Sequence, residues 1–341
     1  LEKDLYTEAT GGSEVIHYMG KSEQEEADYI FSQIEKIISE VDGVNYRDFA
    51  ILYRANYLSR AFEQKLIQRQ IDYKIFGGLK FFNRKEVKDA LSYIRLMVNQ
   101  DDLSFERIVN VPARGVGAKT LEKIQNKAIE YGITNYEALC LYADEIGISG
   151  KAKKQLSQFV TCIENAKHSS LALPDLFEKL LIDLGYFDML RNDQDENRIQ
   201  NLMELKNSIT NYMNTHPDSA NFESYLQDIA LYTSQDDIFD DEYVSLMSIH
   251  MAKGLEFNYV FVVGLSEDIF PSFRSVSEGG DDGMEEERRL AYVAFTRAKK
   301  RLYLTDSQGF NFITNSPKIS SRFIDAIGSD YVEHVGNLFQ F

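Results

Sequence analysis

Apolar positions in the first hundred residues alternate between the spacing of strands and that of helices. Glu14–Met19 is a β-branched apolar run, and an amphipathic helix is predicted directly after it. The buried stripe of that helix is predicted to be Ala27, Ile30, Phe31, Ile34, Ile37 and Ile38. Further strands are predicted at Asp48–Arg54 and Ile71–Phe76, and further helices at Leu58–Arg69 and Arg84–Val98. Strands separated by helices predict a parallel α/β sheet.

The middle of the chain has a different pattern. From residue 99 to 241, helical periodicity repeats with short polar connections, which predicts an all-α domain. Strand signals then return, at Tyr243–Ile249, Tyr259–Leu265 and Arg301–Thr305. A glycine- and acid-rich loop is expected at Ser277–Gly283, before a helix. The predicted fold class is therefore α/β, with a parallel-sheet domain (1–98 and 242–341) interrupted by an all-α inserted domain (99–241).

Composition limits the class of protein. A chain of 341 residues, 44% hydrophobic with only 5 Pro, is typical of a globular protein with about two domains. The longest apolar stretch is far shorter than the roughly 20 residues of a membrane span, and no charged-then-apolar leader opens the sequence. We therefore expect a cytoplasmic protein. Cys140 and Cys162 lie outside any CxxC or Cys/His cluster, so neither a zinc site nor a disulfide is predicted, and both are interpreted as buried apolar thiols.

The net charge of -17 disfavours nucleic-acid binding, because long-range attraction to phosphates requires basic surfaces. The charge is uneven, however. Acidic runs lie at 236–242 and 278–287, whereas every charged residue from Arg288 to Arg301 is basic. Phosphates can be held in a locally basic channel inside an acidic shell. The alternative is that these runs form solvated faces.

Gly20-Lys21-Ser22 follows a predicted strand and opens a helix, as does the end of the phosphate loop of nucleotide hydrolases. The glycine that such a loop needs five residues before Gly20 is replaced by Val15, and a β-branched residue cannot make that turn. Ser22 and Glu25 instead predict a capping box. No Asp ends the apolar strand at 259–265, so a metal ligand is also missing. We expect no complete ATP site within this chain.

Two segments carry a specific resemblance. Leu246–Phe257 (LMSIHMAKGLEF) and Glu285–Leu304 (EEERRLAYVAFTRAKKRLYL) closely resemble the later motifs of superfamily 1 DNA helicases of the UvrD/PcrA type. Supporting matches are ILYRANYLSR (51–60), GGLKFFNRKEVKDALSYIRL (77–96), VPARGVGAKTLEKI (111–124) and SRF (321–323). The phosphate loop, DExx strand and NYRS motif of the family are absent. The chain therefore resembles the C-terminal half of such a helicase, a RecA-like second motor domain with its inserted helical subdomain.

The resemblance implies residues that bind ATP. Arg297 resembles the arginine finger, and its planar, permanently charged guanidinium suits the charge that develops on a transferring phosphoryl group. Helical spacing would place Arg297 on one face with Arg289 and Val293. Gly254 would approach the terminal phosphate and Glu256 the ribose, at the carboxyl end of a strand, where open α/β sheets bind ligands. ATP and Mg²⁺ would be held mostly by the missing N-terminal half.

By the same resemblance, four residues of the α/β domain contact DNA. Ser248 and His250 would contact single-stranded DNA, and Arg54 and Asn56 its backbone. For His250, the alternative is a satisfied core residue. For Asn56, the alternative is a helix N-cap, which is compatible with binding.

Two further segments are expected at the DNA duplex. In RGVGAKT, Gly115 and Gly117 would let backbone N–H groups reach duplex phosphates at a helix N-terminus, supported by Lys119 and Thr120. The hairpin-like QGFNFIT turn would place Phe310 or Phe312 against the last base pair. Core packing is the alternative for both aromatic residues.

The expected function is the C-terminal portion of an ATP-dependent 3′→5′ DNA helicase that translocates on single-stranded DNA and unwinds duplex. Its expected partners are single-stranded DNA, single/double-strand junctions, the N-terminal motor domain of the same protein, and repair or replication proteins, with no membrane. The fragment alone is expected to be inactive, and Leu1 as first residue suggests truncation. The alternative is a non-catalytic DNA- or protein-binding module derived from a helicase half. An upstream GxxxxGK[ST] loop would decide between them.

Overall fold

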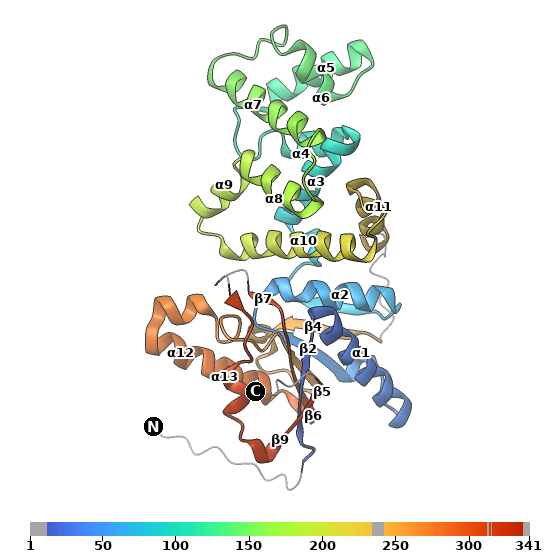
Figure 1. Cartoon of the computed structure of the whole chain (residues 1–341), viewed down its shortest axis with the longest axis vertical. Coiled ribbons are helices and arrows are strands. Elements are labelled where there is room, and N and C mark those ends of the chain that lie inside the picture. Colours follow the sequence, from blue (N-terminus) through green and yellow to red (C-terminus); the bar gives the residue numbers. More distant parts are fainter. Residues whose placement is uncertain (1–11, 234–241, 312–313, 315, 337–341) are drawn as a thin grey trace. The chain divides into compact units, whose positions relative to one another are not determined.

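The computed structural model describes residues 12–233, 242–311, 314 and 316–336. The chain divides into two compact units (Figure 1). The α/β unit consists of residues 1–80 and 237–341, and the helical unit consists of residues 81–236. The first division falls between residues 80 and 81, before helix α3 (Lys85–Asn99), because α3 packs against α4, α7, α10 and α11 of the helical unit, whereas the sequence predicts a boundary at 98/99.

The α/β unit is built on a sheet of seven strands. In sheet order these are β3 (Tyr73–Phe76), β4 (Val244–Ser248), β2 (Phe49–Tyr53), β5 (Phe257–Val263), β6 (Ala298–Ser307), β1 (Val15–Gly20) and β9 (Val332–Gly336). All neighbouring strands are parallel. The predicted parallel α/β class is confirmed.

Helices cover both faces of the sheet (Figure 1). The elements outside the sheet are α1 (Glu23–Glu40), α2 (Ser59–Gln68), α12 (Phe273–Phe295), α13 (Arg322–Asp325), the short strands β7 (Phe310–Asn311) and β8 (Ser316–Pro317), and the 3₁₀ turns η1 (Tyr46–Asp48), η2 (Asn56–Leu58), η4 (Ile249–Ala252) and η5 (Ser329–Tyr331). Side chains alternate across a strand, so Ile51 of β2 joins the core with α1 and α2 whereas Leu52 joins the core with α12. Burial on both faces explains why β2 reads as a continuous apolar run.

The segment expected as a loop at Ser277–Gly283 contains a turn, but helical geometry extends into it from both sides. α12 consists of two helical segments that meet at Gly280 (φ 55, ψ -130), where the backbone leaves helical geometry and the chain changes direction (Figure 1). A Cβ on Gly283 would lie 1.9 Å from the carbonyl oxygen of Ser275. Glycine at 283 therefore permits close approach of the two helical segments beside the turn.

The capping interpretation of Ser22 is confirmed with one adjustment. The Ser22 Oγ accepts a hydrogen bond from the Glu25 N–H (3.2 Å), which caps α1. The Glu25 carboxylate accepts from the N–H of Lys21 (2.7 Å), one residue before the position that a capping box uses. A Cβ on Gly20 would lie 2.9 Å from the backbone nitrogen of Glu26, so this turn also requires a glycine.

The described part of the helical unit contains helices and no strand, as predicted. It begins with η3 (Phe81–Asn83) and α3 and continues with α4 (Asp102–Ile108), α5 (Ala118–Tyr131), α6 (Asn135–Tyr142), α7 (Gly150–Lys167), α8 (Leu173–Asp183), α9 (Tyr186–Asn192), α10 (Glu196–Thr215) and α11 (Phe222–Thr233). The prediction of buried thiols is wrong, because Cys140 lies on the exposed face of α6 and Cys162 is half-buried. No helix in the described ranges is long and apolar enough to cross a membrane.

Candidate nucleotide and DNA sites

The candidate residues of the α/β unit lie at two opposite edges of the sheet. Arg54 and Ser248 lie at the carboxyl ends of β2 and β4, whereas Glu256 and Arg297 directly precede β5 and β6. At about 3.3 Å per residue, these strands separate the two edges by roughly 20 Å. The expectation that Gly254 and Glu256 lie at a carboxyl end is wrong, because the connection from β4 to β5 carries the chain to the other edge.

Arg297 lies beyond the last turn of α12, which ends at Phe295, but its side chain folds back onto that turn. Nε donates to the Val293 carbonyl (2.9 Å), Nη1 to the Leu255 carbonyl (3.0 Å) and Nη2 to the Thr296 hydroxyl (2.9 Å). Because a guanidinium has five N–H groups, one remains on each Nη atom. No carboxylate in the described ranges pairs with Arg297. The side chain thus presents a positioned pair of donors suited to an anion.

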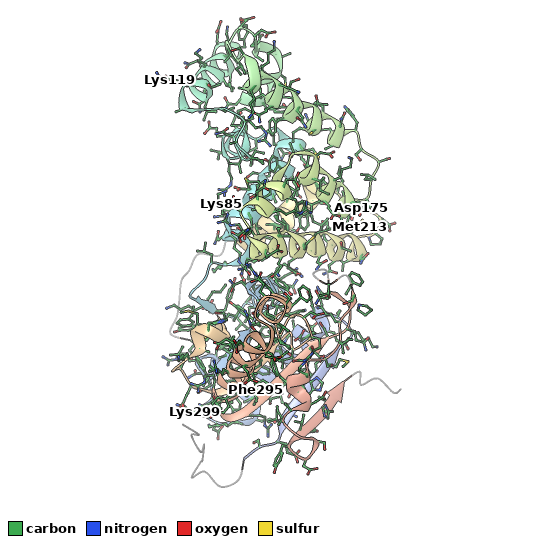
Figure 2. The ribbon with its side chains drawn as sticks, turned by 90° about the vertical axis from the view of Figure 1, so that its left-hand side faces the viewer. Lys85, Lys119, Asp175, Met213, Phe295 and Lys299 are labelled. Carbon is green, nitrogen blue, oxygen red and sulfur yellow. The ribbon has the colours of Figure 1, made fainter. Side chains whose placement is uncertain are left out.

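The Leu255 carbonyl brings Gly254 and Glu256 beside Arg297. Gly254 has φ +86, and no atom lies within 4 Å of where its Cβ would be, so its backbone is open to a ligand. Glu256 is exposed, and its carboxylate lies 3.6 Å from Nζ of Lys299. Figure 2 labels Phe295 and Lys299, which flank the Arg297 turn. The three predicted nucleotide-binding residues therefore gather at one edge.

Asn56, Ser248 and His250 lie at the carboxyl edge, where Ser248 is paired in register with Tyr53 of the neighbouring strand. The helix-cap alternative for Asn56 is wrong, because Ala55 precedes η2 and Asn56 lies within it, exposed. The core alternative for His250 is wrong as well, since this residue is exposed. Partial burial and the positive charge of Arg54 lower the pKa of His250, which favours the neutral imidazole.

Arg54 is engaged by a partner that the sequence did not indicate. Its Nε and Nη2 atoms donate to the carboxylate of Glu287 on α12, at 3.0 and 2.7 Å, and Nη2 also reaches Oγ of Ser275 (3.2 Å). Burial alone would raise the pKa of Glu287. The hydrogen bonds and positive charge of Arg54 outweigh this effect of burial, so the pKa of Glu287 lies below its ordinary value. Arg54 therefore joins β2 to α12 at the carboxyl edge.

The candidate duplex loop ends at Gly117, which precedes α5 and leaves the first N–H groups of that helix without a side-chain cap. Gly115 has φ +76, and its Cβ would lie 3.1 Å from Cβ of Ala152, so both conformation and space favour glycine there. Lys119 is exposed in the first turn of α5 (Figure 2), and Thr120 is half-buried. This helix start can accept an anion.

The buried side chain of Arg114 stabilises the candidate duplex loop. It is 5% exposed and donates to the Ile108 carbonyl (2.9 Å) and the Leu184 carbonyl (3.3 Å). Ile108 ends α4 and Leu184 caps α8, so one cation satisfies the carboxyl ends of two helices. Oδ1 of Asn110 accepts the N–H groups of Arg114 (2.7 Å) and Val116 (3.1 Å). Arg114 lies within the motif that resembles the helicase family, but the motif does not indicate this structural role.

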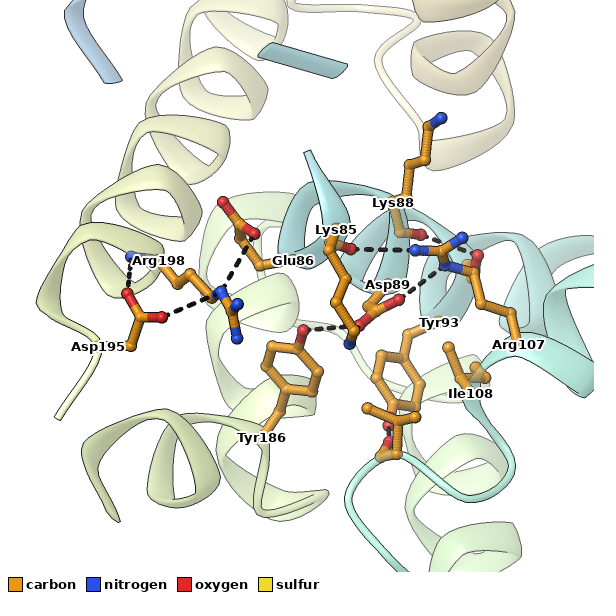
Figure 3. Close-up of polar contacts among 12 residues, drawn as sticks. Lys85, Glu86, Lys88, Asp89, Tyr93, Arg107, Ile108, Tyr186, Asp195 and Arg198 are labelled. Atoms are coloured by element: carbon orange, nitrogen blue, oxygen red, sulfur yellow. Dashed lines mark hydrogen bonds and ion pairs between the residues drawn. The ribbon is translucent and has the colours of Figure 1, made fainter. Parts of the chain in front are cut away.

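Polar side chains of α3 support the same loop (Figure 3). The Tyr93 hydroxyl donates to the Val111 carbonyl. The buried Asp89 carboxylate accepts from Nζ of Lys85 (2.6 Å), Nε of Arg107 (2.7 Å) and the Tyr186 hydroxyl (2.9 Å). Because this buried carboxylate is fully paired, α3 holds α4, α9 and the loop in a defined arrangement.

The predicted hairpin-like turn is confirmed at its base. Strands β7 and β8 are antiparallel, with Phe310 opposite Pro317. Phe310 is 41% exposed, so the core alternative is wrong for this residue. Phe312 lies outside the described residues.

Comparisons with known proteins agree with this architecture. A family model described as the UvrD-like helicase C-terminal domain matches residues 2–309. The ATP-dependent DNA helicase PcrA of Staphylococcus epidermidis is 37% identical over 343 residues, which cover 98% of this chain and 47% of that protein. The ATP-dependent DNA helicase PcrA of Staphylococcus aureus is 36% identical over 340 residues, covering 97% and 46%. The chain spans about half the length of the curated relatives it matches.

Proposed function

This chain belongs to the family of UvrD-like helicase C-terminal domains, and on that premise we propose that it is the second motor domain of an ATP-dependent 3′→5′ DNA helicase. The observation that carries the proposal is the Arg297 guanidinium, hydrogen-bonded to the Leu255 carbonyl between Gly254 and Glu256. A fixed cation beside an open backbone suits a phosphate chain.

In this mechanism, ATP and Mg²⁺ are held mainly by the N-terminal motor domain of the complete protein. Arg297 donates across the cleft to the phosphoryl oxygens, where negative charge develops during transfer. The Gly254 backbone approaches the terminal phosphate, and Glu256 accepts a hydrogen bond from the ribose. The open space at Gly254 and the two remaining N–H groups of Arg297 support these roles.

DNA is proposed to bind in two places on the chain. The carboxyl edge of the sheet offers Arg54, Asn56, Ser248 and His250 to single-stranded DNA. On the helical unit, the N-terminus of α5 offers Gly115, Gly117, Lys119 and Thr120 to duplex phosphates. Phe310 and Phe312 are proposed to stack on the last base pair. Closure of the two motor domains on ATP would then move the protein along the strand.

Unwinding by the complete protein tests this function. Duplexes with a 3′ or a 5′ single-stranded tail are incubated with ATP, and strand release is followed. We expect release from the 3′-tailed duplex only, and only when ATP is hydrolysed. A protein that binds tailed duplex without DNA-stimulated turnover would be a binding module, and the proposal would be wrong.

A further inference from the structure

Glu287 is a buried carboxylate that the functions proposed above leave unused. Its side chain is 1% exposed, and it accepts hydrogen bonds from Arg54 and from the N–H of Ser272 (3.0 Å). A buried carboxylate needs such partners, because water no longer solvates its charge. Within the described ranges, Arg54 is the cation that pairs with it.

Arg54 keeps donors for a ligand while it holds Glu287. The ion pair and the bond to Ser275 use Nε and Nη2, and within the described part of the chain Nη1 donates to no acceptor. The Arg54 side chain is 19% exposed, at the edge where Ser248 and His250 lie. A strand phosphate can therefore reach a guanidinium whose opposite side is fixed by Glu287.

Helix α12 leads from this ion pair to the other edge of the sheet. Glu287 precedes Arg297 by ten residues, which is about 15 Å at the helical rise of 1.5 Å per residue. Between them, Leu290, Ala291 and Ala294 are buried against the sheet. Because protein interiors are close-packed, this half of α12 moves as one body. Its last turn holds Nε of Arg297 through the Val293 carbonyl.

We propose that Glu287 is a positioning residue that couples DNA binding to ATP hydrolysis. It fixes Arg54 at the DNA edge, and the same helix carries that constraint to Arg297 at the nucleotide edge. If Glu287 carried no charge, a phosphate bound to Arg54 would displace only the flexible Arg54 side chain. Because the charged Glu287 holds Arg54, a phosphate bound to Arg54 also displaces α12. This inference rests on the proposed helicase function.

The test compares Glu287→Gln with Glu286→Gln in the complete helicase. Both substitutions remove one negative charge from neighbouring positions, but Glu286 is exposed and pairs with the exposed Arg289. ATP turnover is measured without DNA and with saturating oligothymidylate, and the ratio of the two rates is the readout. We expect the ratio to fall about tenfold for Glu287→Gln, the order of effect of one lost charge-assisted hydrogen bond. For Glu286→Gln we expect a change of less than about twofold.

A double-variant cycle separates coupling from folding. If Glu287→Gln unfolds the protein, Arg54→Gln with Glu287→Gln removes both charges and leaves neither unpaired, so the double variant is the one to measure. When all variants fold, the double variant should lose no more stimulation than the larger single loss, because the pair acts as a unit.

One result would overturn the coupling, namely a parent-like ratio in the folded Glu287→Gln or double variant. Such a ratio includes an equal loss of DNA-free and DNA-stimulated turnover, which a merely structural role gives. A parent protein whose ATP turnover does not respond to DNA would instead overturn the proposed function itself, and this is visible before any variant is made.

Discussion

Under the proposed function, replacing Arg297 by alanine in the complete protein should abolish ATP turnover while leaving the fold intact. The substitution removes three hydrogen bonds, to the Val293 and Leu255 carbonyls and the Thr296 hydroxyl. Arg297 is only partly buried, so water replaces these bonds, and the loss of unfolding free energy should be about 1–2 kcal/mol. An arginine finger contributes roughly 10³ to 10⁵ in turnover, or about 4–7 kcal/mol of transition-state stabilisation. The effect on catalysis therefore exceeds the effect on stability.

Two further variants make the Arg297 experiment specific. Arg297→Lys should restore little turnover, because one ammonium cannot keep the three bonds and also present two donors. Arg289→Ala removes the same charge from the exposed face of α12, where the ion pair with Glu286 contributes about 0–1 kcal/mol. ATP turnover, single-strand affinity and melting temperature are measured for each. Arg297→Ala turnover within a few-fold of the parent, with Arg289→Ala inactive, would refute the assignment.

Three other predictions use the same structure. Gly117→Val should fold, because Gly117 has φ -87 and open space around it, but should weaken duplex binding selectively; equal weakening on single strands would contradict a duplex site. The isolated chain should not hydrolyse ATP, since it holds no phosphate loop; turnover that disappears in Lys21→Ala would reverse this conclusion. Burial raises the pKa of the Glu26 carboxyl group from 4.5 to about 7, so the folded chain binds the carboxyl proton more tightly than the unfolded chain does. The contribution of this protonated group to the free energy of unfolding is therefore complete below pH 4.5 and is lost as the pH rises through 7. Glu26→Gln should therefore gain stability relative to the parent between pH 5 and pH 8, by up to about 3 kcal/mol; a melting-temperature difference that stays constant over this range would disprove it.

Elements with strong local signals could be predicted from the sequence, and elements with mixed signals could not. The central strands β2 and β5 are continuous apolar runs because both faces of the sheet are covered. Strand β9 has no such run, since Glu333 and His334 at the sheet edge are exposed. The loop predicted at Ser277–Gly283 is a tighter turn at Gly280 between two helical segments, although glycine lowers helix propensity by about 1 kcal/mol. Close backbone approach between Gly283 and Ser275 explains the glycine beside this turn.

The sequence by itself determined the family and the candidate functional groups of this protein, and the tertiary structure decided which of these groups lie together. Motifs identify the guanidinium of Arg297 and the glycines before α5, because such signals extend over only a few residues. The partners of these groups come from far along the chain: Leu255 lies 42 residues from Arg297, and Glu287 lies 233 residues from Arg54. No periodicity or spacing encodes such pairs. Strand order and the path of α12 bring them together, because buried charges and donors must find partners wherever the packed chain places them.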